Sequence, residues 1–251
     1  MERFIKIKCV GSLNSFRLPD FHTYHKTLPL PPKSTIAGML GSAAGLNPEE
    51  VNARLLGNDT AFRVGVWGVN SGKTNDLWQI KKYDTKTIAS YKKGEVNAPY
   101  KTAVIVRELL YHCHFTLYLT FKNESDFDFF YEKLQNPSWA LSLGREDELV
   151  KINNITIIYC EEVGVSFLKN TVFEGNKYSI ESTSLGQNQG VNLLSKAPIT
   201  SRLPRQFSYK EGVREAVAFS SYVFVDDLPV KPTNDEKCYF DEEDSTYFQL
   251  I

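Results

Sequence analysis

The segment Leu28–Leu46, LPLPPKSTIAGMLGSAAGL, constrains the fold most because it holds an extended approach and a helix start within nineteen residues. Its prolines, at positions 29, 31 and 32, keep the chain extended, since each ring fixes φ and disfavours helix in the preceding residue. Ser34 then predicts an N-cap. Apolar side chains at i, i+3, i+4 and i+7 predict one buried helix face, formed by Ile36, Met39, Leu40 and Ala43.

The opposite face of this predicted helix carries only small residues: Gly38, Gly41 or Ser42, and Gly45. Because nothing bulky projects there, another backbone can approach closely. Lys33, Ser34 and Thr35 stand where unpaired N–H groups and the positive end of the helix dipole would meet an anion. Two interpretations stay open, a tightly packed core helix with an ordinary cap and an anion-binding helix terminus.

The rest of the pattern predicts an α+β fold with the order β-α-β-β-α-β over residues 1–160. Residues 3–10 alternate as a strand with a basic outer face, and residues 61–69 form a strand with Phe62, Val64 and Val66 inward. Residues 102–121 are strand-rich but look too long for one unbroken strand. A helix with a stripe of apolar residues ends at Asn136-Pro137, and residues 151–160 supply another strand. This order is typical of the ferredoxin-like unit that RNA-recognition motifs share. Past residue 161 helical periodicity is lost, which predicts a smaller β-rich lobe over 161–232.

The net charge of −1 divides unevenly along the chain. From residue 233 to 251 there are six acids and one base, so the body holds 28 bases and 24 acids. We expect this acidic tail to be a solvated end, with docking on a basic partner as the alternative. Four scattered cysteines without a CxxC pair favour a reducing cytoplasm, and no run of eighteen apolar residues predicts a membrane span.

Residues 73–101 are the most basic segment, with seven lysines and four interleaved aromatic rings. Cations beside rings suit the backbone and the unstacked bases of single-stranded nucleic acid. A lysine-rich hairpin that only keeps the protein soluble is the alternative. The long connection 11–32 carries a similar mixture of cations and rings: Arg17, His22, Tyr24, His25 and Lys26.

Three segments, 15–46, 139–152 and 202–225, resemble the Cas-five family of CRISPR-associated RAMP proteins, closest to its type I-B members. The resemblance implies a subunit of the type I Cascade complex that binds the 5′ handle of crRNA in antiviral defence. It implies the helical-backbone subunit and the large subunit as partners, with target DNA reached only through the complex. It also implies that the basic segment, at about 71–103, is a thumb-like insertion that kinks the RNA between handle and spacer.

The residues expected to contact RNA are cationic, aromatic or at the helix start: Arg17, His22, Tyr24, Lys26, Lys33, Ser34, Thr35, Lys81, Lys82, Lys92, Lys93, Arg107, Arg145, Arg202 and Arg205. Arg145 lies in Leu143-Gly144-Arg145-Glu146, which matches the family's glycine-arginine turn. The alternative for Arg145 is an ion pair with Glu146 or Glu148. Arg202 and Arg205 are expected to brace either RNA or a neighbouring subunit.

We expect no catalysis, metal or cofactor. His112-Cys113-His114, and His22 with His25, lack a carboxylate or cysteine at ligand spacing, and no nucleophile motif occurs. The type I-C branch of the resembled family is a metal-independent endoribonuclease with a Tyr, Lys and His set. The nearest candidates here are Tyr111-His112 and Tyr24-His25-Lys26. The alternatives to a non-catalytic subunit are therefore a crRNA-processing endoribonuclease and a protein-only assembly scaffold.

Overall fold

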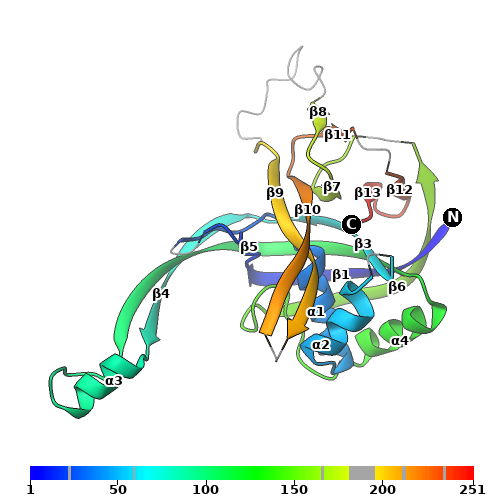
Figure 1. The fold of residues 1–251 in the computed structure, drawn as a ribbon. Helices are drawn as coiled ribbons and strands as arrows, with labels where there is room; N and C mark the ends of the chain where they lie inside the picture. Colours follow the sequence, from blue (N-terminus) through cyan, green and yellow to red (C-terminus); the bar gives the residue numbers. More distant parts are fainter. Residues whose placement is uncertain (22–23, 59, 165–166, 181–195, 211–212, 234–235) are drawn as a thin grey trace.

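Eleven strands join one sheet in the computed structural model, which describes residues 1–251 except 22–23, 59, 165–166, 181–195, 211–212 and 234–235 (Figure 1). The helices are α1 (Lys33–Ala44), α2 (Pro48–Val51), the π-helical turn η1 (Asn52–Leu56), α3 (Thr85–Lys92) and α4 (Glu124–Gln135). The strands are β1 (Glu2–Asn14), β2 (Tyr24–His25), β3 (Phe62–Val69), β4 (Gly72–Lys82), β5 (Lys101–Phe121), β6 (Val150–Val163), β7 (Thr171–Glu174), β8 (Tyr178–Ile180), β9 (Ile199–Lys210), β10 (Val213–Val225), β11 (Val230–Pro232), β12 (Cys238–Asp241) and β13 (Thr246–Gln249).

The centre of the sheet has the strand order β6-β1-β5-β3, with every neighbouring pair antiparallel. One face of these strands packs against α1 and α4, and the core there includes Ile5, Ile7 and Leu117. The residues predicted to point inward are fully buried: Phe62, Val64 and Val66. This confirms the strand predicted at 61–69. The chain is therefore a mixed α/β fold built on a large antiparallel sheet.

Helix α1 begins at Lys33, so the prediction that Ser34 is its N-cap is wrong. Pro32 occupies the N-cap position in an extended conformation, and no side chain caps the helix. The Thr35 N–H donates to the Pro32 carbonyl at 2.9 Å, which closes the first turn with backbone alone. The predicted apolar face of the helix is buried, as the periodicity indicates: Ile36, Met39, Leu40 and Ala43.

The small-residue face of α1 does not receive another backbone at Gly41. The atoms closest to a Cβ built there belong to the Val51 side chain of α2, while a Cβ at Gly38 would meet open space. Helix α2 starts as its sequence indicates, because Asn47 and Glu50 form a reciprocal capping box with Pro48 in the first turn.

Strand β5 runs unbroken for 21 residues, so the expectation of an interrupted strand at 102–121 is wrong. The physical reason is a change of partner along its length. Residues 101–111 pair with β4, whereas residues 114–121 pair with β3 and the strand also pairs with β1. Beyond the body, β4 and β5 continue as a two-stranded arm that α3 closes at its tip (Figure 1).

The last strands of the chain cover the second face of the sheet. β12 pairs with the end of β6, and Leu250 bridges to Gly65 of β3, so that β12, β6, β1, β5, β3 and β13 close into a ring. Inside this ring Phe248 stacks on Tyr118 with ring centroids 3.9 Å apart. A Cβ at Gly65 would collide with the Phe248 ring, so this glycine makes room for the C-terminal strand.

The acids of this C-terminal hairpin neutralise the lysines of β1. Lys6 is only 1% exposed, and its Nζ lies 2.6 Å from Asp241, 2.7 Å from Glu243 and 2.8 Å from Asp244. Lys8 pairs with Asp244 at 2.6 Å. The expectation of a solvated acidic tail is therefore wrong for Asp241, Glu243 and Asp244, because these acids pair with the basic face predicted for β1.

β7, β10 and β9 extend the sheet beyond β3, and β8 with β11 forms a separate two-stranded ribbon. Among the described residues, no helix has the length and apolar character needed to cross a membrane.

Candidate functional site

A cavity of about 270 Å³ lies at the base of the arm. Four of the predicted RNA-contacting residues line it: Arg17, Thr35, Arg107 and Arg145. They come from the segment after β1, the first turn of α1, strand β5 and the loop before β6. We call this the arginine cavity. Ser15, Phe16, His25 and Gly144 complete its wall.

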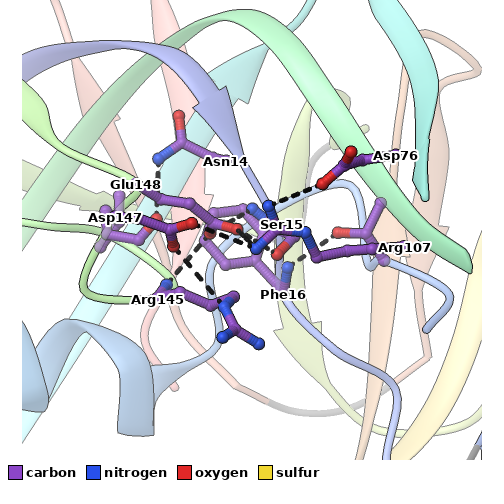
Figure 2. Close-up of polar contacts among 10 residues, drawn as sticks. Asn14, Ser15, Phe16, Asp76, Arg107, Arg145, Asp147 and Glu148 are labelled. Atoms are coloured by element: carbon purple, nitrogen blue, oxygen red, sulfur yellow. Dashed lines mark hydrogen bonds and ion pairs between the residues drawn. The ribbon is translucent and has the colours of Figure 1, made fainter. Parts of the chain in front are cut away.

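Arg107 is held where β5 leaves the body (Figure 2). Its side chain is largely buried, with Nη2 3.1 Å from Asp76 of β4 and Nη1 3.3 Å from Asp147. A third carboxylate, Glu148, is 3.9 Å away. The Nε atom is buried without a hydrogen-bond partner in the described structure. The guanidinium is thus oriented by acids from two sides while it still lines the cavity.

Glu148 holds the two loops that carry the arginines. It is 3% exposed and accepts hydrogen bonds from the backbone N–H of Ser15 at 2.6 Å and of Arg145 at 3.0 Å (Figure 2). The Ser15 hydroxyl also donates to it. A buried carboxylate with several donors is a stable brace, since each bond to a charged group contributes about 1.5–3 kcal/mol.

The glycine-arginine turn needs its glycine. Gly144 has φ 124°, and a Cβ there would collide with the Glu148 carboxylate and lie 2.7 Å from the Ser15 carbonyl oxygen. The alternative of an ion pair within the chain named the wrong partner for the Arg145 side chain: it pairs with Asp147, not with Glu146 or Glu148. The Arg145 side chain lies 3.6 Å from Asp147, and only its backbone N–H bonds Glu148.

Trp78 of β4 lies beside both arginines, a role that the sequence did not single out. The Arg145 Cζ lies 4.2 Å from the centre of its ring, and the Arg107 Cζ lies 5.5 Å away. Stacked guanidinium groups gain cation–π attraction and keep their planes fixed. The only sequence signal was the alternation of rings and cations in residues 73–101, which did not distinguish Trp78 from the other rings.

The segment of β2 runs along the arginine cavity, because Tyr24 pairs with Val106 and His25 with Arg107. The Tyr24 hydroxyl donates to Asn75 of β4 at 3.3 Å, and the Lys26 Nζ lies 5.7 Å from the Phe21 ring centre. Neither lines the cavity. His22 lies outside the described residues.

Lys33, Ser34 and Arg205 line a different, very small cavity of about 10 Å³. Lys33 is buried, with its Nζ 6.0 Å from the Phe62 ring centre, and Arg205 pairs with Glu174 at 3.2 Å. Arg202 lies on β9, with its Cζ 5.2 Å from the Phe219 ring centre. The structure therefore separates these residues from the arginine cavity. The backbone N–H of Thr35 already donates a hydrogen bond to the Pro32 carbonyl. An anion in the arginine cavity would therefore contact the Thr35 side chain and not its amide.

The four remaining lysines lie on the outer part of the arm. Lys81 and Lys82 end β4, Lys92 ends α3, and Lys93 follows it. The Lys81 Nζ lies 4.7 Å from the Tyr100 ring centre. Figure 1 shows this tip projecting away from the body that carries the arginine cavity.

The histidine and cysteine pattern of β5 does not form a nucleophilic site. His112 and His114 are exposed and line a hollow on the outer sheet face together with Lys151. Cys113 between them is buried, and burial raises the pKa of its thiol to about 12, so it stays protonated at neutral pH. In the described part of the chain no group of three possible metal ligands occurs.

The profile of a family described as "CRISPR-associated protein (Cas_Cas5)" matches residues 4–191. Among solved structures, a chain of a "CRISPR RNA-guided surveillance complex" is similar with a TM-score of 0.55 and 16% identity, over 90% of this chain and 91% of that chain. A CRISPR protein from Archaeoglobus fulgidus gives a TM-score of 0.53 and 11% identity, over 99% of each chain. At these identities the likeness is one of fold. No curated protein matches by sequence. Because the profile covers well over half of the chain, the protein belongs to this family of CRISPR-associated proteins.

Proposed function

We propose that this chain is a non-catalytic subunit of a type I CRISPR effector complex, Cascade, and that it binds the 5′ handle of the crRNA. The observation that carries the proposal is the arginine cavity, in which three arginines and a threonine converge from four separate segments. Membership in the family and the fold shared with a chain of an RNA-guided surveillance complex support this assignment. The proposed neighbours are the backbone subunit and the large subunit, and target DNA is met only through the complex.

The chemistry of the cavity suits phosphate. Guanidinium groups donate paired, charge-assisted hydrogen bonds that match the oxygens of a phosphate. Arg107 and Arg145 are already fixed by Asp76, Asp147 and Trp78, so little side-chain entropy remains to be lost when RNA binds. Phosphate contacts set the position of an RNA and carry no sequence information by themselves, so the cavity holds one point of the handle.

The arm extends this surface. In the proposal, β4, α3 and the start of β5 form the thumb-like insertion, and the sheet order β6-β1-β5-β3 with α1 and α4 forms the ferredoxin-like unit that carries it. The tip offers lysines beside exposed rings such as Tyr83, whose centre lies 5.5 Å from that of Tyr100. Such a surface suits a single strand without reading its sequence.

The leading alternative is an endoribonuclease, because His25 lines the arginine cavity between Tyr24 and Lys26. One experiment separates the functions. Purified protein is mixed in EDTA with RNA that carries the handle, and with a matched RNA that lacks it, at several salt concentrations. Intact RNA with handle-dependent retention that weakens with salt supports the proposal. Neutralisation of about three phosphates by the three arginines alone predicts a slope of log affinity against log salt near −2, and each phosphate that the arm tip also neutralises steepens it by about 0.7.

Shortened RNA with a 2′,3′-cyclic phosphate end would instead assign the protein as an endoribonuclease. If RNA is retained neither by the free protein nor by a particle that contains it, the protein is an assembly scaffold. Equal retention of both RNAs would contradict recognition of the handle and leave only general RNA binding.

A further inference from the structure

Strand β6 leaves one of its edges open. On one side it pairs with β1 along residues 150–160, and on the other side β12 pairs only with residues 161–163. At the start of the strand the preceding loop closes the edge, since Ser142 bridges to Leu149 and the Val150 N–H donates to Leu141. Between these two closures, residues 151–160 have no paired strand on this side in the described structure.

Apart from the exposed Lys151 at its start, the open window is unusual in its lack of charge. From Asn153 to Cys160 the sequence is NNITIIYC, with β-branched and aromatic side chains and no charged residue. Other long open edges in the described part of the chain carry charge or proline: β4 has its lysines and Asp76, β9 has Arg202, Pro204 and Arg205, and the part of β10 before β7 has Arg214 and Glu215. Proteins usually place charge or proline on edges that stay exposed, because an uncharged edge pairs with other chains.

A groove of about 520 Å³ lies along this edge, where an added strand would run. Ile152 and Ile155 of β6 form one side, and Leu134, Pro137 and Trp139 form the other. Trp139 is 69% exposed and Tyr159, farther along the same strand, is 62% exposed. Large aromatic residues at this exposure beside an unpaired strand are typical of a site that another chain covers.

The charges around the edge indicate the chemistry of that chain. Glu124, Asp128 and Glu132 are exposed and recur every four residues on α4, which places them on one helix face. Glu124 and Asp128 reach Arg3, at 2.7 Å and 3.6 Å, and Arg3 is the partner of Tyr159 in the β1–β6 register. Arg3 neutralises part of this acidic row, but three acids against one arginine leave it net acidic beside the open edge. A strand that binds there is therefore favoured when it carries Lys or Arg.

We propose that residues 151–159 of β6 take up an extended strand from another subunit of the effector, one with apolar side chains toward the Trp139 groove and basic residues beside α4. This inference rests on the proposed function, since it requires that the chain enter a particle. Main-chain hydrogen bonds would supply the attachment, and the groove would select alternate side chains. A second copy of this chain is disfavoured, because two-fold pairing of β6 edges would bring two acidic α4 rows together.

The test measures amide hydrogen exchange of residues 151–159 in the free protein and in the RNA-loaded particle purified after co-expression with the backbone and large subunits. In the particle we expect exchange about tenfold slower or more, as paired edge amides become protected. A double variant, Asn154→Lys with Tyr159→Lys, places gatekeeper charges on the edge and should lower the share of this chain in the particle about tenfold. Val217→Lys, an equally exposed apolar position on β10, is the matched control and should enter the particle normally.

Equal exchange in the free protein and the particle, or normal entry of the double variant, overturns the proposal. Protection in the free protein that rises with protein concentration would assign the edge to a second copy and also overturns it. Handle RNA binding by the free double variant is measured alongside and should match the wild type. A wild-type chain that copurifies with RNA while β6 exchanges freely rejects the edge proposal alone, whereas loss of RNA from every sample rejects the proposed function.

Discussion

Two buried cations, Lys6 and Arg107, each face three carboxylates, yet they do different work. The carboxylates around Lys6 lie 2.6–2.8 Å from its Nζ and attach the C-terminal hairpin to β1. Those around Arg107 lie 3.1–3.9 Å away and leave the guanidinium on the wall of the arginine cavity. The difference indicates two roles for a buried cation. Lys6, with short contacts to all three acids, stabilises the fold, whereas Arg107, with longer contacts, is oriented by its acids and keeps N–H donors available for a ligand.

The largest expected effect is the loss of the Lys6 cluster. Lys6→Met removes the partner of Asp241, which is buried and keeps only the hydrogen bond from the Tyr118 hydroxyl, at 2.9 Å, among its side-chain donors in the described structure. Removing one partner of a buried ion pair costs about 3–5 kcal/mol. We therefore expect the free energy of unfolding, measured in urea at pH 7, to fall by this amount. Lys8→Met is the control. Lys8 is partly exposed and pairs with Asp244 and Glu243 but not with the buried Asp241, so its loss should cost less than about 1 kcal/mol. Equal losses would remove the distinction between the two lysines.

The next effect concerns the turn that supports the arginine cavity. Gly144→Ala forces a Cβ into the Glu148 carboxylate at a φ of 124°, so we expect a loss of about 2–3 kcal/mol in the free energy of unfolding. RNA affinity should fall with it, because Glu148 can no longer hold the Arg145 backbone. Gly38→Ala is the control, since a Cβ there meets open space in α1 and should stabilise by about 0.5–1 kcal/mol. A Gly144→Ala protein as stable as the wild type would show that the brace is not rigid.

Arg107→Lys tests whether the looser cluster serves binding. The variant keeps the positive charge but loses the planar fork, so we expect handle RNA to bind about tenfold more weakly, or about 1.4 kcal/mol. The measurement is a binding titration at fixed salt. Arg63→Lys provides the comparison, because Arg63 pairs with Glu2 at 3.0 Å away from the cavity, and its affinity should not change. An equal loss in both variants would mean that Arg107 contributes only general charge.

The sequence predicted the elements whose signals are local. The buried face of α1 and the strand at 62–69 follow from periodicity, and the cap at Asn47 follows from three neighbouring residues. Periodicity also placed Lys6 on an outer face, which is correct for the strand. It could not show that this face is buried, because the acids that cover Lys6 come from the other end of the chain.

The arginine cavity illustrates the same limit. Arg17 and Arg145 lie in segments that resemble the family, and Arg107 was selected from its place on a strand beside the basic insertion. The groups that orient them come from elements far apart in sequence. Asp147 and Trp78 have no local pattern that marks them as partners of an arginine, and the unbroken length of β5 depends on a change of pairing partner. Long-range pairing, not composition, decides these features.

A smaller effect should appear on acidification. Burial alone would raise the pKa of Asp244, but hydrogen bonds from Lys6 and Lys8 outweigh it and hold that pKa below its usual range. Its stabilising contribution is therefore present above the unfolded value, about pH 4, and is lost as pH falls through the lower folded value. We expect the thermal midpoint to drop between about pH 4 and 2, and Asp244→Asn to lack this part of the drop. An unchanged acid profile in the variant would contradict the pairing with Lys6.

The smallest effect on stability is expected at the arm tip, where cations take part in neither kind of cluster. Replacing Lys81, Lys82, Lys92 and Lys93 together with Gln should change the free energy of unfolding by less than about 0.5 kcal/mol per site, as exposed substitutions usually do. The salt slope of RNA binding should nevertheless become shallower, by about 0.7 for each phosphate that the tip no longer neutralises. The matched control replaces four exposed lysines of the body with Gln: Lys122, Lys169, Lys177 and Lys231. If both quadruple variants keep the wild-type slope, the tip does not follow the RNA backbone, and binding depends on the base of the arm alone.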